Sequence, residues 1–361
     1  MSNAAAVSAT IPQHSSQTVA VASVDDQCAT QWNDYVARRA AASIYHRYEW
    51  RRLIAAVFRH DTHYFIARDG AGAICGLVPL VRLRSLLFGD FLVSMPYFNY
   101  GGIVSDDESA ACALREHVAE FARSLGVSHV ELRHSEPVCP DWPARTDKVS
   151  MRLDLPPSAG ALDRQLGSKV RAQIKRPVRE GATCVHGHAE LLADFYAVFA
   201  RNMRDLGTPV YSRALFASVL QALGDQARVF IVRWRGAPVA AALVIGDRGR
   251  LEIPWASSLR EANAIGVNML LYWNVLEYAC ERQYASFDFG RSTVDAGTYR
   301  FKKQWGAQPT QLHWHYWLRA GGEPPVLNPS NPKYRLAIAA WQRLPLAVAN
   351  RIGPLLVRNL P

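Results

Sequence analysis

The two halves of this 361-residue chain repeat one order of predicted secondary structure. Each half opens with two helical segments and continues with three apolar strands, the first two joined at glycine; a helix and a last strand follow. Strands joined by tight turns pair antiparallel, whereas a strand that follows a crossover helix pairs parallel. The repeat therefore predicts the α/β fold class, with two tandem domains that each contain a mixed (α+β) sheet. The matching landmarks are Tyr45 and Tyr211, Phe65 and Phe230, and the closing strands at 130–133 and 286–289.

This repeat divides the chain into four predicted segments. Residues 1–24 form a disordered tail, 25–155 the first domain, 156–320 the second domain, and 321–361 a proline-rich linker with a basic amphipathic extension. The tail lacks the basic start and apolar core of a signal peptide, and no apolar run approaches the ~18 residues of a spanning helix. We therefore expect a cytoplasmic protein.

The positive charge is concentrated in two segments. The formal charge is +10, and residues 161–182 hold six basic and two acidic side chains, while 324–361 hold five basic and none acidic. A general polybasic shell is excluded, and no DNA partner is expected; local basic surfaces of this kind bind phosphates or anionic lipid. The segment 324–361 is broken by prolines, so it either packs on the second domain or lies peripherally on the inner membrane.

The six cysteines have neither metal-ligand nor redox-motif spacing. His186 and His188, like His313 and His315, alternate as strand residues do, without a cysteine or carboxylate pair at helical spacing beside them. We expect reduced thiols and no metal site.

A helix is predicted over residues 162–180, with apolar residues every four positions and basic residues on the opposite side. Arg171 and Lys175 lie on the basic side, and Pro177 must kink or end the helix. We expect this side to bind phosphates of a nucleotide-linked acceptor or of RNA; a solvated charged face is the alternative.

The segment 95–102 places three aromatic rings and an amide between a strand and a double glycine. It either presents Tyr97, Asn99 and Tyr100 to a substrate or forms an aromatic corner that plugs the sheet.

Polar side chains gather where the closing strand of the second half ends. Asp288, Arg291, Ser292 and Thr293 come from this strand end, where residues that line a cleft emerge in sheets with crossover helices. The segment 297–306 follows, in which aromatic residues flank a cationic pair; protective lysines on an edge strand are the alternative. The candidate residues of this second segment are Tyr299, Lys302 and Lys303.

Together these segments resemble the FemAB family, in particular its branch associated with exosortase/PEP-CTERM exopolysaccharide systems. The resemblance covers about residues 25–345 and is strongest over 286–306. It implies two GNAT-like domains and transfer of an acyl or aminoacyl group to an amine of a cell-envelope or exopolysaccharide precursor, nucleotide- or lipid-linked as in peptidoglycan synthesis. It also implies aminoacyl-tRNA or acyl-CoA as co-substrate, with no tightly bound cofactor. Lys302 matches the lysine that is the candidate catalytic cation of the family.

The chemistry of aminolysis assigns expected roles to these residues. An amine that attacks an ester or thioester builds an oxyanion, which Lys302 would stabilise, and loses a proton, which Asp288 would accept. The chain lacks the glycine-rich loop of coenzyme A-dependent acetyltransferases, and Asn268 remains as the candidate cofactor contact. A non-catalytic scaffold of an exopolysaccharide assembly system is the alternative. The substrate contacts would be Tyr97, Asn99, Tyr100, Arg171, Lys175, Arg291, Ser292, Thr293, Tyr299 and Lys303.

Overall fold

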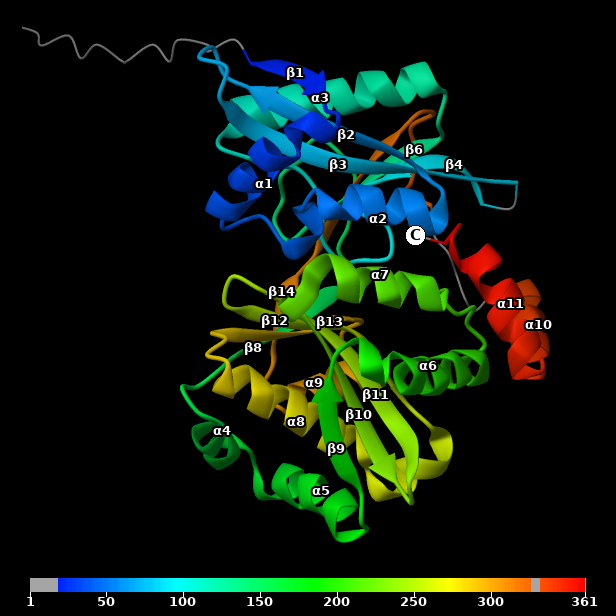
Figure 1. Ribbon diagram of the computed structural model, residues 1–361. Helices are drawn as coiled ribbons and strands as arrows, with labels where there is room; N and C mark the ends of the chain where they lie inside the picture. Colours follow the sequence, from blue (N-terminus) through cyan, green and yellow to red (C-terminus); the bar gives the residue numbers. More distant parts are fainter. Residues whose placement is uncertain (1–18, 87, 326–331, 361) are drawn as a thin grey trace, which may run out of the picture.

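The computed structural model describes residues 19–86, 88–325 and 332–360 and contains two mixed sheets, one above the other in Figure 1. The fold class and the two tandem units predicted from the repeat are confirmed. The first sheet runs β1 (Ala20–Ser23), β2 (Asp61–Arg68), β3 (Ile74–Ser85), β4 (Gly89–Val93), β6 (His129–His134), β15 (His313–Leu318) and β7 (Ala144–Arg145), with β5 (Val104–Ser105) on β3. The second runs β14 (Gln308–Gln311), β8 (Val149–Asp154), β13 (Ser286–Ser292), β12 (Arg250–Ser258), β11 (Ala237–Asp247), β10 (Ala227–Trp234) and β9 (Thr183–Gly187).

Helices cover both sheets, and the halves share one apolar core. α1 (Ala29–Arg38) and α2 (Glu49–Phe58) lie below the first sheet, and α2 contacts α7 (Arg213–Leu223) above the second; α6 (Leu192–Leu206) lies against β10, β11 and β12 (Figure 1). A single buried cluster joins these layers and includes Trp50, Phe98, Phe216 and Trp255. The outer faces carry α3 (Glu108–Leu125) on the first sheet and α4 (Ala159–Gln165), α5 (Ser168–Arg179), α8 (Val267–Glu281) and α9 (Gly297–Lys303) on the second.

The closing strand of each half pairs only briefly with its parallel neighbour. β4 and β6 pair at Leu92 and Val93, and β12 and β13 pair from Arg250 to Glu252. The last pairs are Val93 with Glu131 and Glu252 with Asp288. Glu131 and Asp288 therefore occupy equivalent positions at the point where the strands separate.

The sheets do not divide at residue 155. β8 lies before this expected boundary but pairs with β13 and β14 of the second sheet. β15 lies within the expected second domain but pairs along its length with β6 of the first sheet. The expected tail also ends earlier, because β1 pairs with β2; residues 1–18 lie outside the described residues. Local patterns predict that a strand exists, whereas its partners depend on the packing of distant segments.

The helix expected over residues 162–180 is two helices. α4 ends at Gln165, Leu166 is extended, and Gly167 is the N-cap of α5. Pro177 lies in the last turn of α5, so the helix ends two residues after it.

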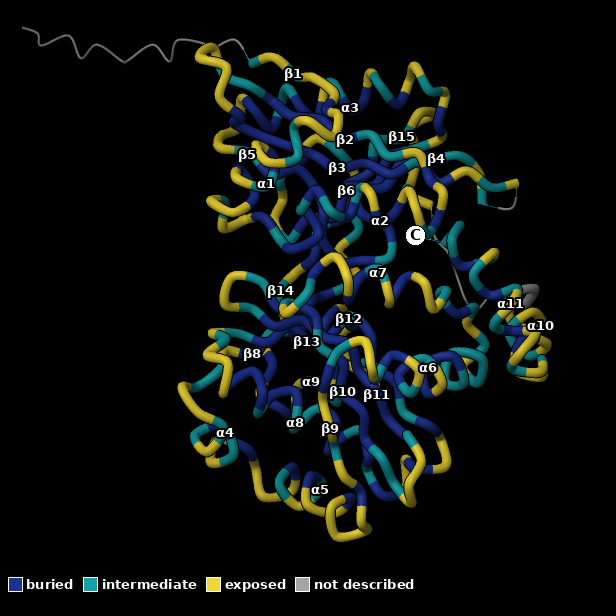
Figure 2. The backbone as a smooth tube through the Cα atoms, viewed as in Figure 1, coloured by how far each residue is buried: buried dark blue, intermediate teal, exposed yellow. Residues whose placement is uncertain are grey.

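The C-terminal segment packs on the protein. α10 (Pro332–Gln342) and α11 (Leu346–Val357) contact α6, and Gly353 lies against Val210. The Arg358 carbonyl accepts hydrogen bonds from the Tyr97 hydroxyl (2.6 Å) and from His60 Nε2 (2.7 Å). The outer faces of both helices are exposed (Figure 2). No helix among the described residues is long and apolar enough to cross a membrane.

Candidate active site

A fully buried carboxylate, Asp288, lies where β12 and β13 separate. The Tyr100 hydroxyl donates to its Oδ2 (2.6 Å), and Ser150 Oγ and the Gly290 N–H donate to its Oδ1 (2.8 Å each). Arg152 Nε lies 3.5 Å from Oδ2. Buried carboxylates need such donors because their desolvation is otherwise costly. Asp288 is therefore a fixed anion with both oxygens engaged.

The aromatic segment of the first half enters the gap between these strands. Tyr100 reaches Asp288, the Phe98 ring packs edge-on against Trp255 of β12, and the Asn99 amide lies beside Gly290 of β13. Phe98 and Tyr100 are buried, whereas Tyr97 and Asn99 are half-buried. Part of this segment thus fills the gap, as one of the two sequence-based interpretations expected.

A second buried carboxylate, Glu252, is the parallel-strand neighbour of Asp288 and is 5% exposed. Burial and the negative charge of Asp288 raise its pKa to about 8. The adjacent Tyr45 hydroxyl is also fully buried and makes no hydrogen bond of normal geometry. Glu252 was not among the residues expected from the sequence. The sequence feature that could have indicated Glu252 is its place as a carboxylate within the largely apolar strand β12.

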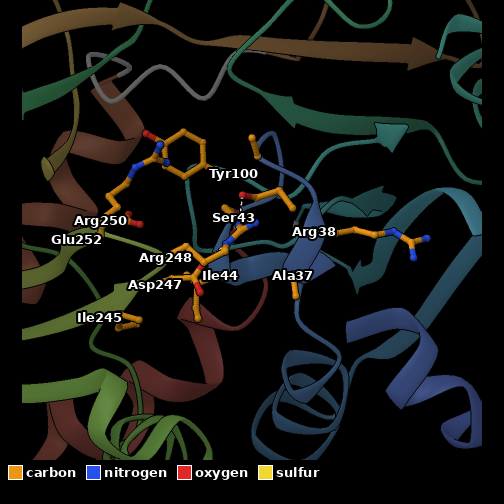
Figure 3. Close-up of a pocket in the computed structure, with 12 residues that line it drawn as sticks. Ala37, Arg38, Ser43, Ile44, Tyr100, Ile245, Asp247, Arg248, Arg250 and Glu252 are labelled. Carbon is orange, nitrogen blue, oxygen red and sulfur yellow. Dashed lines mark hydrogen bonds and ion pairs between the residues drawn. The ribbon is translucent and has the colours of Figure 1, made fainter. Parts of the chain in front are cut away.

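Glu252 and Tyr100 line a cavity of about 440 Å³ between the halves (Figure 3). The first half contributes residues near the end of α1 and the turn after it, and the second half contributes the β11–β12 hairpin. In Figure 3 the Arg250 side chain extends from β12 alongside the Tyr100 ring. A smaller cavity of about 50 Å³ shares Ser43, Tyr100 and Arg250 with the first and reaches Arg152.

One arginine at these cavities has a donor without a partner. The Arg250 Nε is buried and makes no hydrogen bond, whereas the Arg152 Nε, which also makes none, lies in an ion pair with Asp288 Oδ2. Arg248 differs, because its guanidinium donates to the backbone carbonyls of Val36, Arg39 and Ala42. Buried donors of this type are ordinarily satisfied, so the cavity is suited to a ligand with a carbonyl or anionic oxygen.

Lys302, on α9, is 7% exposed and contacts the backbone at the end of β13. Its Nζ donates to the carbonyls of Gly290 (3.0 Å) and Arg291 (2.8 Å). Burial lowers its pKa to about 8, although the charge of Asp288 opposes this shift. Two of its three donors are therefore used by the backbone, and Lys302 does not line either cavity.

The remaining expected site residues do not converge on the cavity. The guanidinium of Arg291 stacks on Trp314 at 5.1 Å, Thr293 Oγ1 accepts a hydrogen bond from Lys148 Nζ, and Lys303 lies over the Tyr299 ring. Ser292 is buried, and Asn268 lies in the first turn of α8. Arg171 and Lys175 line a separate groove beside α5. The structure thus brings Tyr100, Asn99 and Lys302 of the expected set to the strand end at Asp288, and of these only Tyr100 lines the cavities.

One buried cluster has the composition of a metal site. The ligand atoms of His134, Cys139 and His315 lie within 4.8 Å of one another. The Ile103 N–H donates to His134 Nε2 (2.8 Å), so the neutral His134 ring carries its proton on Nδ1, 3.0 Å from Nδ1 of His315. Burial lowers the pKa of both imidazoles and keeps them neutral. A metal at His134 Nδ1 would require loss of that proton, so the geometry fits a hydrogen-bonded pair of imidazoles.

Residues 168–303 match the family described as acetyltransferase (GNAT) domain. This range contains Glu252, Asp288 and Lys302. No curated protein matches the chain.

Several solved structures share the whole fold. The crystal structure of FemX is 12% identical, covers 88% of this chain and 100% of its own, and has a TM-score of 0.65. A tandem GNAT protein from the clavulanic acid biosynthesis pathway is 16% identical; the match covers 85% of this chain and 100% of that protein, with a TM-score of 0.52. L-PGS from Bacillus licheniformis is 16% identical; the match covers 80% of this chain and 91% of L-PGS, with a TM-score of 0.51. The chain therefore has the tandem GNAT fold of these proteins.

The raised pKa of Glu252 predicts that the stability of the fold depends on pH. A carboxyl whose pKa is about 8 in the folded state and near 4.5 in the unfolded state stabilises the fold when protonated. This contribution is complete below pH 4.5 and is lost as the pH rises through 8. The melting temperature of the parent should fall between pH 6 and 9, and Glu252→Gln should flatten this fall. One pKa unit corresponds to about 1.4 kcal/mol, so we expect a difference of several degrees by calorimetry. Identical pH profiles for the two proteins would contradict the assignment.

Proposed function

We propose that this chain is a GNAT-type acyltransferase that moves an acyl or aminoacyl group from acyl-CoA or aminoacyl-tRNA to an amine held in the cavity between the halves. The observation that carries the proposal is Glu252, a buried carboxylate at the wall of that cavity whose pKa is raised to about 8. The GNAT match over 168–303 and the likeness to FemX and L-PGS support it. The acceptor class we propose is an envelope or exopolysaccharide precursor, as in the resemblance to the FemAB family.

The hydrogen bonds of the two buried carboxylates decide which of them we assign as the proton acceptor. The amine nitrogen attacks the carbonyl carbon, a C–N bond forms, and the C–O or C–S bond of the donor breaks. The amine proton passes to Glu252 and then to the leaving group, which a group with a pKa near 8 can both accept and release. Asp288 is less suited to this step because both of its oxygens already accept hydrogen bonds.

The guanidinium of Arg250, whose Nε has no hydrogen-bond partner, would stabilise the oxyanion that forms at the same time. Lys302 acts as a positioning residue. It holds the strand end at Gly290 and Arg291 and compensates the charge of Asp288.

Replacing Glu252 tests the proposed chemistry. Glu252→Gln should lower kcat by about 10² to 10⁴ and leave the KM for the amine within a few-fold, since general base catalysis contributes that range. The measurement is transfer of a radiolabelled group from acyl-CoA and from aminoacyl-tRNA to amine acceptors. Asp247→Asn is the matched control, because Asp247 lines the same cavity but pairs with Arg248. Equal losses in both variants would reject Glu252 as the proton acceptor.

Alanine variants of the neighbouring Lys302 and Lys303 distinguish a positioning role of Lys302 from a general effect of removing a positive charge. Lys302→Ala removes two hydrogen bonds from a buried strand end, so both activity and stability should fall, with a stability loss of about 2 to 4 kcal/mol. Lys303→Ala should change stability by less than about 0.5 kcal/mol, because Lys303 is exposed. Chemical denaturation and the transfer assay check both effects. A Lys302→Ala protein of parental stability would show that its backbone contacts are dispensable.

We also propose that the outer face of α10 and α11 contacts anionic membranes peripherally, which would suit a lipid-linked acceptor. Leu336 and Leu355 are 76% and 63% exposed there, beside the exposed Arg335 and Arg351. The full chain should sediment with phosphatidylglycerol vesicles at low salt and be released at high salt. Leu336→Glu/Leu355→Glu should abolish sedimentation, whereas Val294→Glu, at another exposed position, should not. Failure of the parent to sediment would show that these helices only pack on α6.

A further inference from the structure

A second groove, of about 900 Å³, lies between α5 and α8 and shares no lining residue with the cavity between the halves. Its floor contains apolar side chains, among them Ile174, Leu270 and Trp273. Arg171, Lys175 and Arg179 line it from α5, and the acidic residues at its wall are Asp163 and Glu277.

The charge of α5 is not compensated within the described part of the chain. The helix carries five basic and no acidic residues in its 12 positions. None of the five makes an ion pair with a described residue. Arg171 Nη1 donates to the Asp163 backbone carbonyl (3.4 Å), which leaves its charge unneutralised. An uncompensated cationic helix beside a groove is suited to an anionic ligand.

The spacing of the cations indicates the shape of that ligand. Arg171, Lys175 and Arg179 recur every four residues, which places them about 6 Å apart along the helix and gives a row of about 12 Å. Lys169 and Arg176 project from another side of α5 and do not line the groove. A row of this length contacts several phosphates in succession, as a linear polyanion presents them, rather than one compact phosphate.

The opposite wall supplies an aromatic ring and an amide, which are suited to contact bases and sugars. Trp273 and Asn274 of α8 are half-buried and line the groove. Asn274 Nδ2 donates to the Leu270 carbonyl, which leaves its Oδ1 to accept a hydrogen bond, for example from a ribose 2′-hydroxyl. A cationic row with an adjacent aromatic ring is the arrangement that binds single-stranded nucleic acid.

From these observations we propose that the α5–α8 groove binds a single strand of RNA, with phosphates on Arg171, Lys175 and Arg179 and a base on Trp273. This site is separate from the proposed acyl-transfer cavity, and its test does not depend on turnover.

The test is the fluorescence anisotropy of a labelled, unstructured ten-nucleotide RNA with the full-length chain at 50–200 mM KCl. Three phosphate contacts predict a slope of log affinity against log salt of about −2. Arg171→Glu/Lys175→Glu should weaken binding at least about 30-fold and flatten the slope to about −0.7. Lys169→Glu/Arg176→Glu, with the same change in net charge on the same helix, should weaken it less than about 5-fold. Equal losses in the two variants would overturn the groove assignment.

A second pair of variants tests the stacking contact. Trp273→Leu should weaken binding about tenfold without changing the salt slope, and Trp273→Phe should retain most of the affinity. Glu252→Gln should bind RNA like the parent, so a failed acyl-transfer assay and a failed RNA assay remain distinguishable. Equal affinity for single-stranded DNA would overturn the choice of RNA. Tighter binding of coenzyme A that displaces the RNA would overturn the strand assignment.

Discussion

The buried charge of Asp288 is the constraint on which the arrangement of the two halves depends. Its donors come from three separate places: Tyr100 in the first half, Ser150 on β8, and Gly290 on its own strand. A buried carboxylate that loses a partner is left with an unpaired negative charge, which costs several kcal/mol. The network therefore holds the aromatic segment of the first half in the gap of the second sheet and, with it, one wall of the cavity.

The equivalent positions Glu131 and Asp288 of the two halves have different surroundings. In the first half, Glu131 occupies the place of Asp288, pairs with Arg133 and accepts a hydrogen bond from the Tyr316 hydroxyl (2.5 Å). These partners lower its pKa despite its burial. Its parallel-strand neighbour is Val93, whereas the neighbour of Asp288 is Glu252. One substitution between the repeats thus places a second carboxylate beside the first and raises its pKa into the range that proton transfer requires.

The two basic segments of the sequence have different environments in the structure. The C-terminal segment packs on α6 and reaches Tyr97 through the Arg358 carbonyl, so it forms part of the folded unit. The cations of α5 make no ion pair with a described residue, and three of them, Arg171, Lys175 and Arg179, line an open groove. Charge counts alone do not separate these cases, because both segments carry a similar net positive charge, +4 for residues 161–182 and +5 for 324–361.

The sequence alone determined the order that the two halves repeat, two helices, three strands, a helix and a strand, and with it the equivalence of the closing strands, because hydrophobic periodicity is a local property. It also indicated Tyr100, Asp288 and Lys302. Only the tertiary structure decided that β8 and β15 lie outside their expected domains, and that Glu252, Arg152 and Arg250 line the cavities beside Tyr100. Burial, strand partners and pKa depend on contacts between segments far apart in the chain. Tyr100 and Asp288 are separated by 188 residues, and no local pattern encodes that contact.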